Sequence, residues 1–140
     1  MKLNLITLEG IVLDTDVYEV ILPTAEGEIA VFPSHEPLVT LAVPGAIAVR
    51  YNEADADSKL DFFAISGGVI QISQKLVKVL VDEADRGDDI IENEVQAALE
   101  RAIQLRDSAD SQMDLDKAHQ MVDRHQVRLK VAELRRRHHR

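Results

Sequence analysis

The chain has 140 residues, enough for one ordinary domain or for one small domain with an appendage. Hydrophobic residues make up 46% of it and aromatic residues only 4%, so a packed core must be built mainly from Val, Ile, Leu and Ala. The absence of cysteine excludes a disulfide framework and thiolate chemistry, and the net charge of −9 argues against nucleic acid as a partner.

The charge is divided unevenly along the chain. Residues 1–89 carry a net charge of −10 and residues 90–116 one of −5, whereas residues 117–140 carry +6. The basic end is therefore expected to seek an acidic surface. No apolar run approaches the roughly 18 residues of a membrane span, and the N-terminus turns polar too soon for a secretory signal. Membrane association is expected only through a partner.

The first 82 or so residues contain a series of short segments with the composition and alternation typical of β-strands. The segments LNLIT, VYEVIL, AIAVRY, FFAIS, VIQIS and LVKVLV follow one another at short spacing, separated by Pro- and Gly-containing turns. This pattern predicts an antiparallel sandwich or barrel. The pair Gly67 and Gly68 fits a tight turn or bulge that needs positive φ.

After the segment VDEADRGDD, which ends at residue 89, the hydrophobic period changes to that of a helix. Asp88 or Asp89 is a candidate cap for the first helix, with Glu92 and Glu94 in its first turn, and Asp114 is a candidate cap for the second. Two apolar stripes follow the helical spacing: Ile91, Val95, Ala98, Ala102 and Leu105, and then Leu115, Ala118, Val122, His125, Leu129 and Ala132. We expect a β domain over residues 1–86 and a loosely held antiparallel helical hairpin over residues 87–140.

The segment Pro33–Pro37 contains Ser34, His35 and Glu36, the side-chain types of a catalytic triad. Neighbouring side chains in extended chain point to opposite faces, and the flanking prolines keep the corner stiff, whereas a triad is assembled from separated positions. We therefore expect no catalytic residue. The corner is either a rigid solvent-facing turn or a docking surface.

Five histidines raise the question of a metal site. His119 and His125 are six residues apart and would face different sides of a helix, while His138 and His139 lie at the terminus, so the spacing indicates no metal. His125 falls on the apolar stripe, where it is either an ordinary histidine with an outward polar tip or a pH sensor. Neither a phosphate loop nor a dinucleotide fingerprint occurs, and no cofactor is expected.

Several segments together resemble one known family. They are Pro33–Thr40, Pro44-Gly45, Ser66–Gly68, Val79–Ala84, Ala97–Ala102 and Val131–Leu134. In their order and approximate spacing they resemble the epsilon subunit of F-type proton-translocating ATP synthase, over the whole chain. The family pattern Gly-x-x-Gly-apolar-x-Pro-Gly-His-x-Pro-Leu matches Gly27–Leu38, with Ala30 and Ser34 in place of two glycines.

The resemblance implies a ten-stranded antiparallel β-sandwich of two five-stranded sheets, followed by a helix–loop–helix. It implies a non-catalytic subunit of the rotating central stalk that binds the gamma subunit and the c-subunit ring and couples proton flow to ATP synthesis. The hairpin of the family extends along gamma to the alpha and beta subunits, where it restrains ATP hydrolysis. The implied location is the cytoplasmic face of a bacterial plasma membrane, with the stromal side of a plastid thylakoid membrane as the alternative.

The resemblance also implies roles for particular residues. Glu28 matches a position near the polar loops of the c ring, and the corner of Ser34, His35 and Glu36 matches the part of the sandwich that faces the stalk and the ring. The implied inhibitory residues, which would meet an acidic patch on the catalytic subunits, are Arg124, Arg128, Arg135, Arg136 and Arg137.

One family property is not matched. Members whose hairpin binds ATP carry Ile/Leu-Asp-x-x-Arg-Ala at the start of the first helix, where this chain places Ile91, Glu94 and Val95 at the acid, arginine and alanine positions. A shift by one residue supplies no cation either, so we predict no useful ATP binding. The alternatives to the rotor subunit are a nucleotide-sensing switch, which the missing motif disfavours, and a general β-sandwich adaptor with a helical protein-binding arm.

Overall fold

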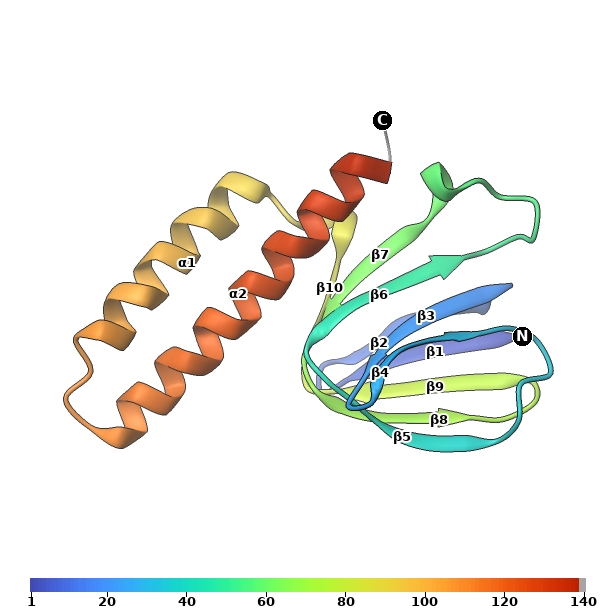
Figure 1. Cartoon of the computed structure of the whole chain (residues 1–140), viewed down its shortest axis with the longest axis horizontal. Coiled ribbons are helices and arrows are strands. Elements are labelled where there is room, and N and C mark those ends of the chain that lie inside the picture. The colour runs from blue at the N-terminus through green and yellow to red at the C-terminus, as the bar shows by residue number, and fades with distance from the viewer. Residues whose placement is uncertain (139–140) are drawn as a thin grey trace.

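A computed structural model of the chain describes residues 1–138, and His139 and Arg140 lie outside the described residues. Ten strands are followed by two helices (Figure 1). The strands are β1 (Lys2–Thr7), β2 (Gly10–Asp16), β3 (Glu19–Thr24), β4 (Gly27–Val31), β5 (Leu38–Ala42), β6 (Gly45–Arg50), β7 (Asp61–Ile65), β8 (Gly68–Ile72), β9 (Leu76–Val81) and β10 (Ala84–Arg86). The helices are α1 (Glu92–Asp107) and α2 (Gln112–His138), and short 3-10 turns cover Asp57–Lys59 and Gly87–Asp89.

The strands form two five-stranded layers, as the family resemblance implies. The first layer has the order β10-β7-β6-β3-β4 and the second the order β5-β8-β9-β1-β2, and the pair Thr24 and Ala42 joins them. Neighbouring strands are antiparallel except β1 and β9, which run parallel. These two strands come from opposite ends of the domain, so no hairpin turn sets their relative direction.

The main core lies between the two layers. Inward-facing side chains alternate with outward-facing ones along the strands, and Leu3, Leu5, Phe63, Val77 and Val79 are fully buried. Burial of these side chains stabilises the sandwich by roughly 1.5–3 kcal/mol each relative to exposure. The sandwich is thus held by aliphatic packing, with Phe63 as its largest fully buried residue.

A second apolar cluster attaches the hairpin to the first layer. The C-terminal part of α2 crosses the outer face of β6 and β7, where Val131 and Ala132 pack with Phe62 and Ala64 (Figure 1). Val95 near the start of α1 joins this cluster. The distal parts of the helices pack chiefly on each other. The hairpin is therefore anchored at its base and extends beyond the sandwich.

The contact between the two helices is small. Its buried members are Leu99, Ala102 and Val122. The stripe predicted for α2 is confirmed by the burial of Ala118, Val122 and Ala132, with His125 half-buried. The stripe predicted for α1 is wrong at its ends, because Ile91 and Leu105 are exposed and Leu99 is the residue that packs inward.

The predicted helix caps are also wrong. Asp88 and Asp89 lie in a 3-10 turn, and α1 begins after Ile91, which makes no side-chain capping bond. At α2 the cap is Ser111, whose Oγ accepts a hydrogen bond from the backbone N–H of Asp114 at 3.1 Å. Glu92 does lie in the first turn of α1, as predicted.

The expected positive φ at the paired glycines is not found. Within residues 1–138 the glycines with positive φ are Gly10 and Gly27, both in hairpin turns. Gly68 is needed for a different reason, since a Cβ there would collide with the backbone carbonyl of Leu80 on the neighbouring strand. The pair marks a close approach of two backbones.

Candidate partner-binding surfaces

The sandwich has two ends with different loops. One end carries the N-terminus, the corner Phe32–Pro37 and the turn Ser73–Lys75, and hydrogen bonds such as Lys2 N–H to Lys75 O (2.9 Å) tie it together. We call it the corner end. The other end carries the β3–β4 turn, the β5–β6 turn and the β9–β10 turn, and the helical hairpin lies on this side (Figure 1). We call it the hairpin end.

The corner predicted as a docking surface is exposed and stiff. Ser34 has a φ of 69°, which lies in the left-handed region. The family pattern has glycine at this position, and glycine adopts this region without strain. Its N–H donates to the carbonyl oxygen of Gln74 at 3.2 Å, and His35 Nδ1 lies 2.7 Å from the carbonyl oxygen of Glu36. Glu36 is exposed. The corner is therefore held to the turn Ser73–Lys75 by a backbone hydrogen bond and presents polar side chains.

Glu28 lies exposed at the start of β4, opposite Pro23. The adjoining turn is fixed by the buried Thr24, whose hydroxyl donates to the carbonyl oxygen of Gly27 and accepts from the N–H of Glu26. The carboxylate of Glu28 thus lies at the start of β4, next to this hydrogen-bonded turn at the hairpin end.

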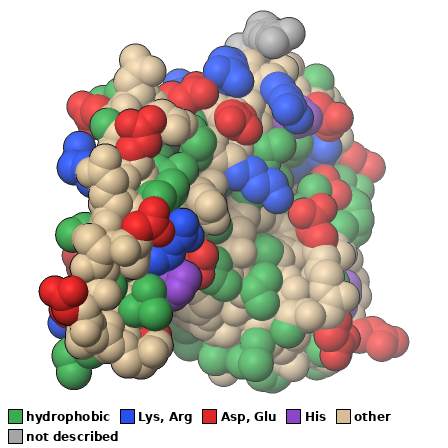
Figure 2. Space-filling view, turned by 60° about the vertical axis from the view of Figure 1, so that its left-hand side comes forward, with side chains coloured by type: hydrophobic (Ala, Val, Ile, Leu, Met, Phe, Trp, Pro, Cys, Tyr) green, Lys and Arg blue, Asp and Glu red, His purple; other side chains and the backbone are tan. Residues whose placement is uncertain are grey.

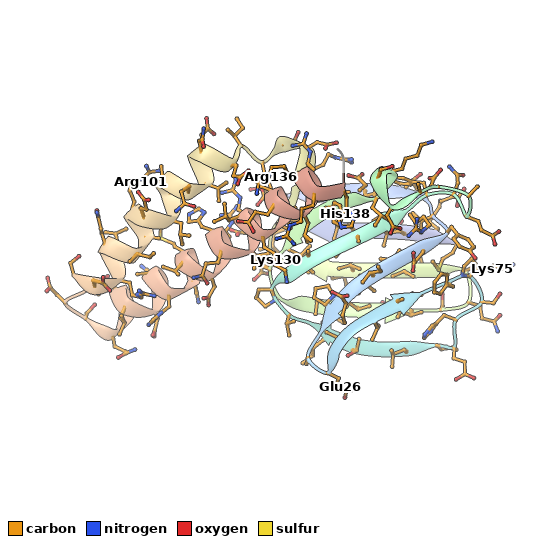
Figure 3. The ribbon with its side chains drawn as sticks, turned by 45° about the horizontal axis from the view of Figure 1, so that its top comes forward. Glu26, Lys75, Arg101, Lys130, Arg136 and His138 are labelled. Carbon is orange, nitrogen blue, oxygen red and sulfur yellow. The ribbon has the colours of Figure 1, made fainter. Side chains whose placement is uncertain are left out.

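Glu28 and the corner do not lie together. Strand β4 runs between them, so they occupy opposite ends of the sandwich; in Figure 3, Glu26 beside one and Lys75 beside the other lie well apart. At about 3.3 Å per residue, the five-residue strand separates them by roughly 15 Å. One small contact cannot include both.

The outer face of the second layer carries an apolar row that sequence reasoning did not identify. Cross-strand pairing places Leu41 beside Val69, Val69 beside Leu80, Leu80 beside Ile6, and Ile6 beside Ile11. Leu41 is 60% exposed and Ile11 66% exposed. We call these five residues the apolar row.

The apolar row could have been found only through strand register. Each member is a single outward residue within its own strand, which is unremarkable by itself. The five become continuous because the order β5-β8-β9-β1-β2 brings together strands from both ends of the sequence. Val39 on β5 and Leu8 in the β1–β2 turn extend the exposed apolar surface.

The basic residues of α2 meet carboxylates within the chain. The Nε atom of Arg124 lies 2.8 Å from Glu83 Oε2, and the Nε atom of Arg128 lies 3.1 Å from Asp85 Oδ2. Both carboxylates belong to the β9–β10 region of the sandwich. These pairs hold the middle of α2 to the hairpin end.

Further pairs lie towards the C-terminal end of α2. Arg135 Nε is 2.7 Å from Asp88 Oδ1, and Arg136 Nη1 is 3.0 Å from Glu92 Oε1. Arg137 is exposed. Figure 3 shows Arg136 and His138 at this end of the helix, and Figure 2 shows basic and acidic side chains side by side on the helical face of the molecule. The arginines predicted to be inhibitory are thus largely engaged while the hairpin is docked.

A cleft of about 540 Å³ lies between α2 and the hairpin end of the sandwich. Its apolar side includes Pro44, Met121 and Val127, and its charged side includes Glu83 and Arg124. The cleft shows that the distal part of α2 stands off the sandwich.

The positions of the unmatched nucleotide motif lie at the start of α1. Ile91 and Glu94 are exposed, and Val95 is buried against the sandwich. The lack of useful ATP binding stays a prediction. Within residues 1–138 no three His, Asp or Glu side chains are grouped so as to hold a metal ion. In the same part of the chain neither helix has the length and apolar character needed to cross a membrane.

The fold and sequence match known proteins. The family model for the beta-sandwich domain of the ATP synthase delta/epsilon chain matches residues 1–87. The ATP synthase epsilon chain of Herpetosiphon aurantiacus is 35% identical over 136 residues, covering 97% of this chain and 96% of that protein. The chloroplastic ATP synthase epsilon chain of Piper cenocladum is 38% identical over 104 residues, covering 73% and 74%.

A chain in the cryo-EM structure of the Euglena gracilis mitochondrial ATP synthase has the same fold. Its TM-score is 0.76 at 24% identity, over 94% of this chain and 79% of that one. The sequence similarities define the class as a small non-catalytic subunit of an ATP synthase. The chain belongs to the ATP synthase delta/epsilon family, and within it to the epsilon chains.

Proposed function

We propose that the chain is a central-stalk subunit that couples proton flow to ATP synthesis, and that it binds the gamma subunit through the apolar row. The observation that carries this proposal is that the two outer faces of the sandwich differ. The chain's own α2 covers β6 and β7 of the first layer, whereas the apolar row of the second layer is left uncovered. A continuous exposed apolar surface of this kind marks a protein–protein interface.

The remaining contacts divide between the two ends of the sandwich. We assign Glu28 to the c ring, where its carboxylate would pair with a basic loop residue and contribute about 0–1 kcal/mol. We assign the corner of Ser34, His35 and Glu36 to the stalk at the opposite end, since a separation of roughly 15 Å requires separate partner surfaces. In this proposal residues 1–86 are the docking unit.

Residues 87–140 are proposed to be the regulatory unit. Exposed ion pairs such as Arg135–Asp88 each contribute about 0–1 kcal/mol, so they can be exchanged for pairs with an acidic patch on the alpha and beta subunits. One arginine cannot serve both carboxylates at once. Inhibition of ATP hydrolysis therefore requires release of the hairpin from the sandwich.

Release also uncovers apolar side chains. Val131 and Val95 are buried against the sandwich, and exposing a valine costs roughly 1.5–3 kcal/mol. An extended hairpin must therefore cover this face again, and we assign that role to the gamma subunit. The docked hairpin is the state preferred in the absence of partners.

The proposed location is the cytoplasmic face of a bacterial plasma membrane, where the subunit is attached through the complex. The bacterial relatives support this assignment. The stromal side of a thylakoid membrane is the alternative, which the chloroplastic relatives support.

The gamma contact is tested by Leu41→Asp. A charge at the β5 end of the apolar row loses its hydration in the interface, so we expect the dissociation constant for gamma to rise at least about tenfold, equivalent to 1.4 kcal/mol. The control is Ala30→Asp, on the exposed face of β4 in the other layer. Equal binding of gamma by Leu41→Asp and by the unchanged chain would contradict the assignment.

The proposed inhibition of ATP hydrolysis by the hairpin is tested by ending the chain before Asp110, which removes α2. We expect the reconstituted complex to assemble and to hydrolyse ATP faster than the complex with the full chain. Equal hydrolysis rates would contradict the inhibitory role of the hairpin but not the role of the chain as a central-stalk subunit.

A further inference from the structure

A polar hollow of about 370 Å³ adjoins the β2 end of the apolar row, at the hairpin end of the sandwich. One wall is formed by the β1–β2 turn and the start of β2, and it includes Ile11 of the apolar row. The other wall is formed by residues 82–85, where β9 passes into β10, and Arg124 of α2 lines the hollow from the helical side. We call it the acidic hollow. It lies between the proposed gamma-binding surface and the docked hairpin.

The charges of the acidic hollow are unbalanced. Among the described residues that line it, the charged side chains are Glu9, Asp82, Glu83, Asp85 and Arg124. Four negative charges against one positive charge leave a formal net charge of −3. A surface of one sign attracts the opposite charge, so the hollow favours a further cation.

Arg124 shows how the acidic hollow holds a cation. Its Nε atom lies 2.8 Å from Glu83 Oε2, and its Nη2 atom lies 3.7 Å from Asp85 Oδ2. Arg128, also on α2, adds a contact of 3.1 Å between its Nε atom and the same oxygen of Asp85. Both arginines leave with α2 when the hairpin is released, whereas both carboxylates stay with the sandwich. The two carboxylates are therefore paired with cations in the docked state and lose these cations in the released state.

The two carboxylates are held in place by the sandwich and not by the hairpin. The backbone N–H of Glu83 donates to Ser66 Oγ at 2.9 Å, and its carbonyl oxygen accepts from the N–H of Ser66 at 3.0 Å. Asp85 lies in β10, opposite Ala64 of β7. We therefore expect the acidic hollow to keep its shape beside the apolar row when α2 leaves.

The two flanks of the apolar row differ in charge. On β9, Lys78 lies two residues before Leu80 and points to the same face of the sheet, whereas Asp82 lies two residues after Leu80 and lines the acidic hollow. A basic side chain of a partner is attracted to the hairpin-end flank and repelled from the other. The charge pattern therefore favours one direction of the partner across the row.

We propose that the acidic hollow receives a Lys or Arg side chain of the partner that covers the apolar row, in competition with Arg124. The choice of gamma as this partner rests on the proposed function. The partner segment has an apolar face and a cation beside Ile11. Because its cation and Arg124 use the same carboxylates, partner binding and hairpin docking oppose each other, each weakening the other by the same factor.

The competition is tested by titrating the purified gamma subunit with the full chain. Arg124→Gln leaves Glu83 available to the partner, so we expect the dissociation constant to fall about two- to fivefold, the range for one exposed ion pair. The matched control is Arg135→Gln, which removes the same charge from the same helix and breaks a similar pair with Asp88, outside the hollow. Its effect should be clearly smaller. No fall in Arg124→Gln, or an equal fall in both variants, would overturn the proposal.

A second comparison shows whether Glu83 carries the gain. In a chain that already contains Glu83→Gln, the additional change Arg124→Gln should no longer lower the dissociation constant, because the shared carboxylate is absent. A gain of the same size in both backgrounds would show that Arg124 acts elsewhere and would contradict the competition.

The cation of the partner is tested without disturbing the hairpin. Asp82 lines the acidic hollow, whereas the arginines of α2 pair with other carboxylates. Asp82→Asn should raise the dissociation constant for gamma about two- to fivefold, and this difference should shrink at high ionic strength. Asp110→Asn, at an exposed aspartate in the loop between the helices, is the control and should bind like the unchanged chain. Equal binding by both variants would overturn the proposal.

Failure of this inference can be told apart from failure of the proposed function. If the unchanged chain does not bind gamma, the proposed function is contradicted. If Leu41→Asp weakens the binding but Arg124→Gln and Asp82→Asn do not change it, the gamma contact stands and the role of the acidic hollow is contradicted.

Discussion

The sandwich and the hairpin are stabilised by different interactions. Between the two sheets 16 buried hydrophobic residues form one cluster, and most of their side chains have almost no exposure. Among the described residues, the buried cluster between α1 and α2 consists of Leu99, Ala102 and Val122, and the hairpin is otherwise held at its base and by exposed ion pairs. We therefore expect the sandwich to act as the rigid docking part and the hairpin to detach without unfolding the sandwich.

Substitutions of buried residues should give the largest difference in the free energy of unfolding between the two regions. Phe63→Ala removes the largest fully buried side chain and is expected to lower the free energy of unfolding by about 3–5 kcal/mol. Leu99→Ala in the hairpin should cost nearer to 2 kcal/mol and leave the unfolding of the sandwich unchanged. Denaturant unfolding followed separately on sandwich and hairpin probes measures both. A common unfolding transition that both substitutions shift equally would show that the two regions form one cooperative unit.

The next largest effect should come from the ion pairs at the base of the hairpin. Asp85→Asn removes the carboxylate shared by Arg124 and Arg128 and is expected to weaken docking by about 1 kcal/mol. Hydrogen exchange of the α2 amides should accelerate, and high salt should have the same effect on the unchanged chain. Asp82→Asn, at an exposed neighbouring carboxylate, is the control and should leave the exchange unchanged.

A smaller change in the free energy of unfolding is expected at two exposed positions of the sandwich where the family pattern has glycine. Ser34→Gly should raise the free energy of unfolding by about 1 kcal/mol, because φ is 69° there and a Cβ is strained. Ala30→Gly should lower it by roughly 0.5–1 kcal/mol, because Ala30 lies in the regular strand β4. Thermal unfolding measures both changes. Changes of opposite sign would confirm that the backbone is left-handed at Ser34 and extended at Ala30, and changes of equal sign would contradict it.

The smallest effect is expected at Glu28. Glu28→Gln removes one exposed charge and should weaken coupling of proton flow to ATP synthesis only modestly, by about 0–1 kcal/mol in the proposed contact with the c ring. Proton pumping per ATP hydrolysed by the reconstituted complex measures this. A complete loss of coupling would show that Glu28 does more than form a surface pair.

The secondary structure was largely predictable because it depends on local patterns. The alternation in LVKVLV predicts β9, and the stepping of Ala118, Val122 and Ala132 predicts the inner face of α2. The helix caps and the ends of the α1 stripe were predicted wrongly, because they depend on how the flanking segments enter each helix. Several residues near a helix start can cap it, and the choice of Ser111 over Asp114 depends on where the preceding loop arrives.

The partner surfaces were less predictable. The corner Pro33–Pro37 is visible in the sequence because proline stiffens it locally. The separation of that corner from Glu28, and the continuity of Leu41 with Ile11 across five strands, depend on register between segments far apart in the chain. No local pattern encodes such a register.

The sequence by itself determined a β domain followed by a helical hairpin with a basic second helix, because side-chain periodicity and charge are properties of neighbouring residues. The tertiary structure decided which carboxylates engage the arginines of α2, which face of the sandwich is left apolar, and that His125 lies beside Arg128 and close to Asp85. These depend on how two sheets and two helices pack, and packing brings together residues that the chain keeps apart.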